Sequence, residues 1–364
     1  MGVSSITPVL PRISQVFEIT PQEASLLILF FTLPGVFLTP VFGILADLYG
    51  RRRVLAPVLF LFGIAGTLCF WAPDFKTLLI LRVFQGIGAA SLGAMNVTII
   101  SDQFEGMDRA TALGYNSGMV SFGATVYPAI GGALALIGWR YPFLLPLLAI
   151  PTGLLVIFKL KPAQKIVRLK YSEYFSGVYK AMGSRKIRTM FLLSTATFLL
   201  MYGPILTFLP FFMEHFFDSN SLTIGIILAS ISIGNLVSGS MLGRLMEYYT
   251  NVELLLISYL LYAAALILIP FMPYEFLLTI PCVIFGLAIG INNPNIQTLI
   301  AKSVRPAMRA AILSINGMVL RIGQTIGPLI MATFFAIGGY TVAYILSALV
   351  AFGIYFFLRT RAVR

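Results

Sequence analysis

The sequence predicts an all-α membrane protein made of two six-helix halves, and three observations support this. Only 10% of the 364 residues are charged, against roughly 25% in soluble proteins, and 59% belong to the apolar set. Eleven apolar stretches are each long enough to cross a bilayer, and the chain resembles itself at an offset of 200 residues. This composition excludes both a soluble and a disordered protein.

The apolar stretches are predicted to be membrane-spanning helices, because about 20 mostly apolar residues cross the hydrocarbon core as a helix. They do not alternate between polar and apolar residues over about ten positions, as the strands of a membrane barrel do. The stretches lie at 24–45, 54–72, 77–100, 111–136, 141–159, 190–212, 222–245, 252–272, 276–299, 310–337 and 341–358.

The first span is expected to be truncated. The apolar piece at Val3–Leu10 reaches at most about 12 Å as a helix, whereas the hydrocarbon core is about 30 Å thick. At the 200-residue offset, the counterpart of the seventh span, 190–212, would begin before Met1. We therefore expect the chain to begin at an internal or wrongly assigned methionine, with the missing half of this helix encoded upstream.

The basic residues predict the orientation. Twenty of the 25 Lys and Arg residues fall in one set of loops and in the C-terminal tail, three fall in the alternate loops, and two lie inside spans. The positive-inside rule places the basic loops and the C-terminus in the cytoplasm. The net charge of +12 therefore reflects topology, and binding to nucleic acid is not expected.

The internal repeat predicts the domain organisation. Residues 109–138 and 309–338 are identical at ten of thirty positions without a gap, and the matches include Arg, Asn, Pro and Gly. We expect an N-terminal half at 1–159 with spans 1–6 and a C-terminal half at 190–364 with spans 7–12. Residues 160–189 are predicted to be a cytoplasmic linker with a short amphipathic helix. Parallel repeats of this kind are typical of secondary transporters, whose substrate site lies near mid-membrane between the halves.

The loop after the second span carries a motif, since residues 43–55 read Gly-Ile-Leu-Ala-Asp-Leu-Tyr-Gly-Arg-Arg-Arg-Val-Leu. This closely resembles the major facilitator superfamily signature between spans two and three, G-x-L-a-D-r-x-G-r-k-x-x-l, apart from Leu48. The resemblance implies a conformational switch, in which Arg51 can pair with Asp102 at the end of span four. The residues assigned to the switch are Gly43, Asp47, Gly50, Arg51, Arg52 and Asp102. The alternative is that the arginines only set the topology.

The fourth span carries Arg82, Gln85 and Gly86 in the sequence Arg-Val-Phe-Gln-Gly-Ile-Gly. This is similar to the R-x-x-q-G-x-g motif of the superfamily, which implies a role for Arg82 in proton coupling or substrate contact. An arginine inside a span costs at least about 2.5–3.5 kcal/mol on insertion scales and is a functional candidate by default. The alternative is that Arg82 only extends its charged end to the membrane surface.

The fifth span resembles the antiporter motif of the superfamily, g-x-x-x-G-P-x-x-G-G, which implies export in exchange for protons. A tyrosine replaces the glycine before the proline, whereas in the eleventh span the Gly-Pro pair is present and the two later glycines are not. The alternative is a proline-kinked packing helix without a mechanistic role. The residues assigned to the two copies are Tyr127, Pro128, Gly131, Gly132, Gly327 and Pro328.

Arg321 lies near mid-membrane in the eleventh span, roughly 16 Å from its predicted cytoplasmic end. No acidic residue of the sequence is comparably buried. Two buried guanidiniums without a buried carboxylate suggest an anionic substrate or counter-ion, or a partner that this chain lacks. The alternative is a structural arginine bonded to backbone carbonyls and polar neighbours. The other polar residues assigned to the cavity are Asn116, Asn292 and Asn293, which alternatively hold helices together.

Together these features predict a secondary transporter of the major facilitator fold, similar to the multidrug efflux branch, that exports a small organic or drug-like compound. Protons are the expected coupling ion, and the expected form is a monomer in the plasma membrane with its C-terminus in the cytoplasm. An exporter of a sugar or other metabolite is the alternative. A multi-span enzyme or receptor is a remote alternative, because one His and two distant Cys offer no catalytic cluster. No cofactor or metal is expected.

Overall fold

The structure is a computed structural model that describes residues 2–104, 106–160, 182–304 and 309–362. Most of the predicted linker therefore lies outside the described residues. Helices account for the regular structure of the described chain, in which no strand occurs. The first half contains η1 (Thr7–Val9), α1 (Leu10–Phe17), α2 (Pro21–Tyr49), α3 (Arg51–Leu68), η2 (Cys69–Trp71), α4 (Phe75–Ala89), α5 (Leu92–Gln103), α6 (Gly106–Ile137), η3 (Tyr141–Leu148) and α7 (Ala149–Lys159).

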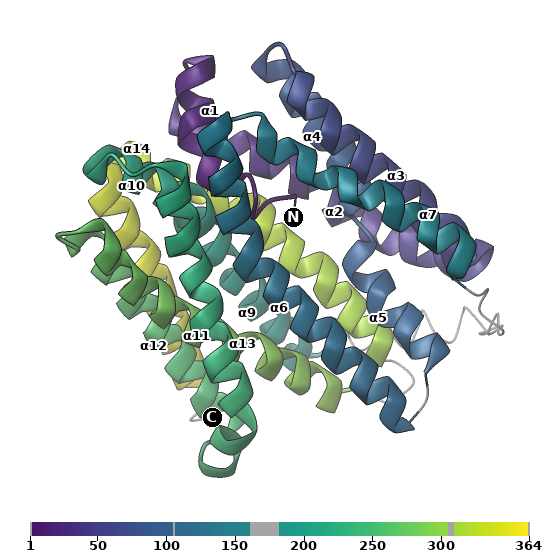
Figure 1. Cartoon of the computed structure of the whole chain (residues 1–364). Helices are drawn as coiled ribbons and strands as arrows, with labels where there is room; N and C mark the ends of the chain where they lie inside the picture. The colour runs from purple at the N-terminus through teal and green to yellow at the C-terminus, as the bar shows by residue number, and fades with distance from the viewer. Residues whose placement is uncertain (1, 105, 161–181, 305–308, 363–364) are drawn as a thin grey trace.

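The second half follows the same plan and lies beside the first, with its green and yellow helices next to the purple and blue ones (Figure 1). It contains α9 (Arg185–Leu200), the π-helical segment η4 (Met201–Phe208), α10 (Leu209–Phe217), α11 (Ser221–Tyr248), α12 (Asn251–Leu268), η5 (Ile269–Phe271), η6 (Glu275–Leu278), α13 (Thr279–Lys302) and α14 (Arg309–Ala362).

The described helices include nine that are long and apolar enough to span a membrane. The sequence predicted eleven apolar stretches of that length, and the difference has two local causes. Span four is divided into α4 and α5 at Ala90 and Ser91, between Gly88 and Gly93, and glycine is a poor helix former. Spans eleven and twelve are joined in α14, whose helical backbone is interrupted at Gly338 and Gly339. Gly339 has φ 68° and ψ −163°, a conformation that essentially only glycine adopts.

The sequence repeat is also a repeat of close contacts. Gly86 of α4 packs against the carbonyl of Phe31 in α2, and a Cβ at Gly86 would overlap that oxygen. Gly286 of α13 packs in the same way against the carbonyl of Ile231 in α11, and both residues lie 200 positions further along the chain. Because backbone approach at this distance requires glycine, the repeat preserves the packing of each half.

The two halves meet along two helix pairs, α2 against α14 and α6 against α11, and α1 also contacts α10. We call the end of the bundle that holds Arg51, Lys159, Arg185 and Arg244 the arginine-rich end, and the end that holds Asp74 and Asp218 the arginine-poor end. Each of α2, α6, α11 and α14 connects these two ends, so the contact between the halves can differ from one end to the other.

Candidate functional site: the contact between the two halves

The loop that resembles the superfamily signature lies at the arginine-rich end. Arg51, the first residue of α3, donates through Nε to a carboxylate oxygen of Asp102 in the last turn of α5, so the predicted ion pair is present. Gly50, between α2 and α3, has φ 90°, which is unfavourable for residues with a side chain. Gly43 and Arg52 are exposed, and the side chain of Asp47 lies outside the described part of the chain.

The ion pair links two helices of the same half, so it does not by itself join the halves. The Arg51 and Asp102 side chains are 18% and 30% exposed, and pairs of this kind contribute at most about 1 kcal/mol to stability. A role of this loop as a switch between transport states therefore stays a prediction, distinct from a role in folding.

We expect Arg51→Ala and Asp47→Asn to reduce transport while folded protein remains in the membrane. The free energy of unfolding of each variant is expected to stay within about 1 kcal/mol of the parental value. Transport rate and thermal stability are measured on the same preparations. The charge-swapped variant Arg51→Asp with Asp102→Arg restores the pair and is expected to recover part of the rate. Parental transport in both single variants would contradict a switch role.

At the arginine-poor end the antiporter-like motif lies in the contact between the halves. A Cβ at Gly132 of α6 would overlap the carbonyl oxygen of Ser221 in α11, and one at Gly225 of α11 would overlap the carbonyl oxygen of Pro128. Gly131 approaches the carbonyl of Ser5 equally closely, but Ser5 belongs to the same half as Gly131. The backbones of α6 and α11 are therefore in direct contact here, which only glycine permits.

The other motif residues pack within their own halves. The ring of the half-buried Tyr127 lies beside Gly123, where a Cβ would be 3.0 Å from ring atom Cε2. In the eleventh span, Gly327 approaches the backbone of Gly203 in η4, and Pro328 is buried. The two copies of the motif thus serve different contacts, because only the copy in α6 has a glycine, Gly132, where it meets the other half.

The same helix pairs are separated toward the arginine-rich end. A Cβ at Gly114 or Gly118 of α6 would meet no atom within 4 Å, and the same holds for Gly239 and Gly243 of α11. These glycines continue, at helical spacing, the faces that touch at Gly132 and Gly225. Among the described residues, the two halves therefore pack against each other at the arginine-poor end and are separated by open space at the arginine-rich end.

Arg82 is fully buried between α4 and α2. Its Nε donates to the carbonyl oxygen of Leu27 at 3.2 Å, its Nη1 donates to Oε1 of Gln85 at 2.6 Å, and its guanidinium stacks 4.3 Å from the ring centre of Phe31. Nη2 of Arg82 and Nε2 of Gln85 are buried without a hydrogen-bond partner among the described residues. Arg82 does not reach the membrane surface, so the snorkelling alternative is not supported by this arrangement.

Arg321 of α14 is half-buried and crosses from the second half into the first. Its Nη2 donates to the carbonyl oxygens of Ala89 at 3.2 Å and Ala90 at 3.0 Å, at the C-terminal end of α4. The side chain passes over Gly35 of α2, where a Cβ would overlap the guanidinium. One turn away, Thr325 donates to the hydroxyl of Thr32 at 3.0 Å, which adds a second bond between the halves.

The predicted cavity asparagines occupy different surroundings. Asn292 is fully buried inside the second half, where it accepts from Thr197 at 2.8 Å and donates to Ser258 at 2.7 Å. These bonds favour the alternative that Asn292 holds helices together. Asn293 is half-buried and accepts from Gln297 at 3.4 Å, and Asn116 is half-buried on α6.

Three pairs of residues that contribute to the contact were not singled out in the sequence. The carbonyls of Ala89 and Ala90 carry no side-chain signal, because every residue has a carbonyl. Thr32 and Thr325 are ordinary residues of apolar helices. At the arginine-poor end, Gln15 of α1 donates to Glu214 of α10 at 2.6 Å, and the distance of both residues from any motif left them unnoticed.

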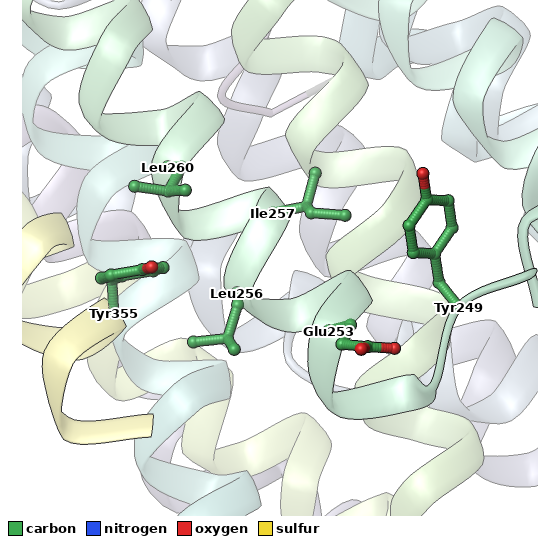
Figure 2. A pocket seen from close by; sticks show the side chains of 6 residues that line it. All are labelled: Tyr249, Glu253, Leu256, Ile257, Leu260 and Tyr355. Atoms are coloured by element: carbon green, nitrogen blue, oxygen red, sulfur yellow. The ribbon is translucent and has the colours of Figure 1, made fainter. Parts of the chain in front are cut away.

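A hollow of about 250 Å³ lies elsewhere, beside α12 and the last part of α14. Figure 2 shows Tyr249, Glu253 and Tyr355 around it, with three aliphatic side chains of α12. Glu253 is engaged in the N-terminal cap of α12, where it accepts from the backbone and hydroxyl of Thr250 at 2.8 and 2.9 Å. This hollow is separate from the contact between the halves.

Comparison with known proteins agrees with this architecture. The sequence profile described as the Major Facilitator Superfamily matches residues 1–219 and 191–364, which together cover the whole chain. The chain belongs to the major facilitator superfamily. A bacillibactin exporter of Bacillus subtilis (strain 168) is similar to it, with 25% identity over 96% of this chain and 89% of that protein.

A multi-drug resistance efflux pump, PmrA of Streptococcus pneumoniae serotype 4, is 27% identical over 98% of this chain and 91% of that protein. A crystal structure of a bacterial homologue of the human lysosomal transporter Spinster has the same fold, with a TM-score of 0.76 and 18% identity. The structural match covers 99% of this chain and 93% of the Spinster homologue. The predicted fold and the predicted resemblance to drug:proton antiporters of the superfamily are confirmed. As a superfamily member the chain is a multi-pass membrane transporter for a small molecule.

Proposed function

We propose that this transporter exports a small organic compound from the cytoplasm in exchange for protons that enter the cell. The arginine-rich end and the C-terminus then face the cytoplasm of a plasma membrane, as the distribution of basic residues predicts. The relatives with efflux names span nearly the whole chain, so the similarity is not confined to one motif.

The observation that carries the proposal is the asymmetry of the contact between the halves. Gly132 of the antiporter-like motif and Gly225 of α11 bring the halves together at the arginine-poor end, while open space remains at the other end. A compound in the cytoplasm can therefore enter between the halves, and release on the outside requires the contact of Gly132 with Ser221 to separate. Such rocking of two repeats about a central site is alternating access.

The proposal is tested in everted membrane vesicles, whose interior corresponds to the cell exterior. We expect vesicles with the full chain to accumulate a fluorescent organic compound once the interior is acidified, with the carboxylate dye 5-carboxyfluorescein and the cationic dye ethidium as first probes. Collapse of the pH gradient with nigericin is expected to remove the accumulation, and Arg359→Gln, at the exposed end of α14, is expected to match the parental protein.

Vesicles without the transporter provide the background rate. Accumulation that persists after the pH gradient is collapsed would contradict proton coupling. Accumulation of a radiolabelled sugar in place of both dyes would contradict the proposed substrate class and favour a metabolite exporter.

A further inference from the structure

Arg321 lies where the packed part of the contact between α2 and α14 gives way to open space. Toward the arginine-poor end, Thr325 and Thr32 are bonded across the halves. Toward the arginine-rich end, a Cβ at Gly317 of α14 or at Gly43 of α2 would meet no atom within 4 Å. Gly317 is one turn from Arg321 on the same face of α14, so a compound that enters from this end reaches the guanidinium of Arg321 at the limit of the opening.

The charge of Arg321 is not balanced by an acid in this part of the molecule. Every Asp and Glu of the described helices lies within one turn of a helix end. The described acceptors of Arg321 are two neutral carbonyls, both bound by Nη2. Arg82, the other cation of the membrane region, is sealed between α2 and α4 and is not accessible to a compound between the halves.

The carbonyl partners of Arg321 are the last ones of a broken helix. Carbonyls at a helix C-terminus lack intrahelical donors, and they carry the negative end of the helix dipole, so they hold a cation. The carbonyl of Ala90 also accepts from Thr39 at 2.7 Å, so it keeps one donor when Arg321 leaves. Ser91, at the same break, is buried and its hydroxyl has no partner among the described residues.

We propose that Arg321 is the substrate-binding residue of this transporter and that it selects compounds with an anionic group, such as a carboxylate. In the empty state the guanidinium rests on the carbonyls of Ala89 and Ala90, and an arriving carboxylate takes their place. The exchange is favourable because a charge-assisted, bidentate bond of arginine to a carboxylate is stronger than a bond to a neutral carbonyl. Binding of the anion thereby releases a bond between the halves.

This inference rests on the proposed export function for its biological meaning, but its test measures binding and needs no gradient. Three probes of nearly the same shape differ in charge: 2-naphthoate, 2-naphthamide and 2-naphthylmethylammonium. Each is titrated into the purified full chain in detergent, and its half-saturating concentration is read from thermal stabilisation, since a ligand of the folded state raises the melting temperature.

We expect the parental protein to bind 2-naphthoate about tenfold more tightly than the amide, and the ammonium compound most weakly. In Arg321→Gln the ratio of the two affinities is expected to fall to about one, and in Arg321→Lys to an intermediate value, because lysine keeps the charge without the bidentate geometry. Arg359→Gln is the matched control and is expected to keep the parental ratio.

A further variant separates binding from a purely structural role. Gly35→Ala places a methyl group where the resting guanidinium lies, and the flexible arginine can move away from it. We expect this variant to bind 2-naphthoate about twofold more tightly or better, since the competing carbonyl bonds are weakened. If Arg321 only joins the halves, Gly35→Ala and Arg321→Gln would weaken the protein alike without changing the preference for charge.

Equal binding of the three probes by the parental protein, binding of none, or an unchanged preference in Arg321→Gln would overturn the inference. The proposed function fails on a different observation, namely transport that ignores the pH gradient in everted vesicles. A gradient-dependent exporter that does not discriminate between the probes would leave the proposed function intact and refute the role of Arg321.

Discussion

Removal of the Arg82 guanidinium is expected to have the largest effect of any single substitution in this transporter. Arg82→Ala leaves the carbonyl of Leu27 and the amide oxygen of Gln85 without their donor in a fully buried interface. Hydrogen bonds to a charged group contribute about 1.5–3 kcal/mol each, and a cavity adds to the loss. Part of this is offset because the desolvated charge is itself costly. We expect a net loss of about 2 kcal/mol or more and transport below about a tenth of the parental rate.

The measurement compares transport rate and melting temperature for Arg82→Ala, Arg82→Met and the exposed control Arg359→Ala. Arg82→Met keeps most of the side-chain volume, so it removes the charge with less of a cavity. If Arg82→Met folds and transports at the parental rate, Arg82 fills space and has no part in coupling. If it folds but does not transport, a functional role for the guanidinium is supported.

Gly132→Ala is expected to have the second largest effect. The added methyl group overlaps the carbonyl oxygen of Ser221, a backbone atom that cannot turn aside as a side chain does. Overpacking of this kind costs about 1–3 kcal/mol. Because the contact exists only while the arginine-poor end is closed, the cost falls on that state and shifts the balance of states by roughly 5- to 150-fold. Transport is expected to fall, with the chain held open toward the arginine-poor end.

The shift can be followed directly by the distance between spin labels on the two halves. Cysteines introduced at the exposed positions Arg140 and Tyr274 accept the labels, and the native Cys69 and Cys282 are fully buried. We expect a longer distance in Gly132→Ala and the parental distance in Gly353→Ala, where the methyl group meets open space. Parental distances and rates in Gly132→Ala would show that the close contact has no part in the transport cycle.

Helices and their repeat were predictable because both depend on patterns within the chain. Apolar stretches of sufficient length must satisfy their backbone as helices in a membrane, so all eleven predicted stretches correspond to described helices. The pair of Arg51 and Asp102 was also predictable, since the motif contains Arg51 and the predicted topology puts Asp102 at the same end of a neighbouring span. Its function stays a prediction, because a contact alone does not reveal in which state it is needed.

The division of span four and the position of Arg321 could not be predicted in the same way. The glycines on either side of Ala90 weaken a helix, but the hydropathy of the stretch is continuous, so the sequence indicated one span. Arg321 was expected near mid-membrane without a carboxylate, and both an anion and backbone carbonyls remained open as its partners. The structure shows the carbonyls of Ala89 and Ala90, which belong to the other half.

The sequence by itself determined the helices, their order, the two-fold repeat and the family, because each of these follows from residue type and spacing along one chain. Only the tertiary structure decided which glycines of the antiporter-like motif touch the other half, where Arg321 finds its acceptors, and that Asn292 is enclosed within the second half. The physical reason is that membrane helices are apolar on nearly all sides, so periodicity does not reveal which face meets which neighbour. Backbone carbonyls, which hold Arg321 in this structure, are carried by every residue and leave no mark in a sequence.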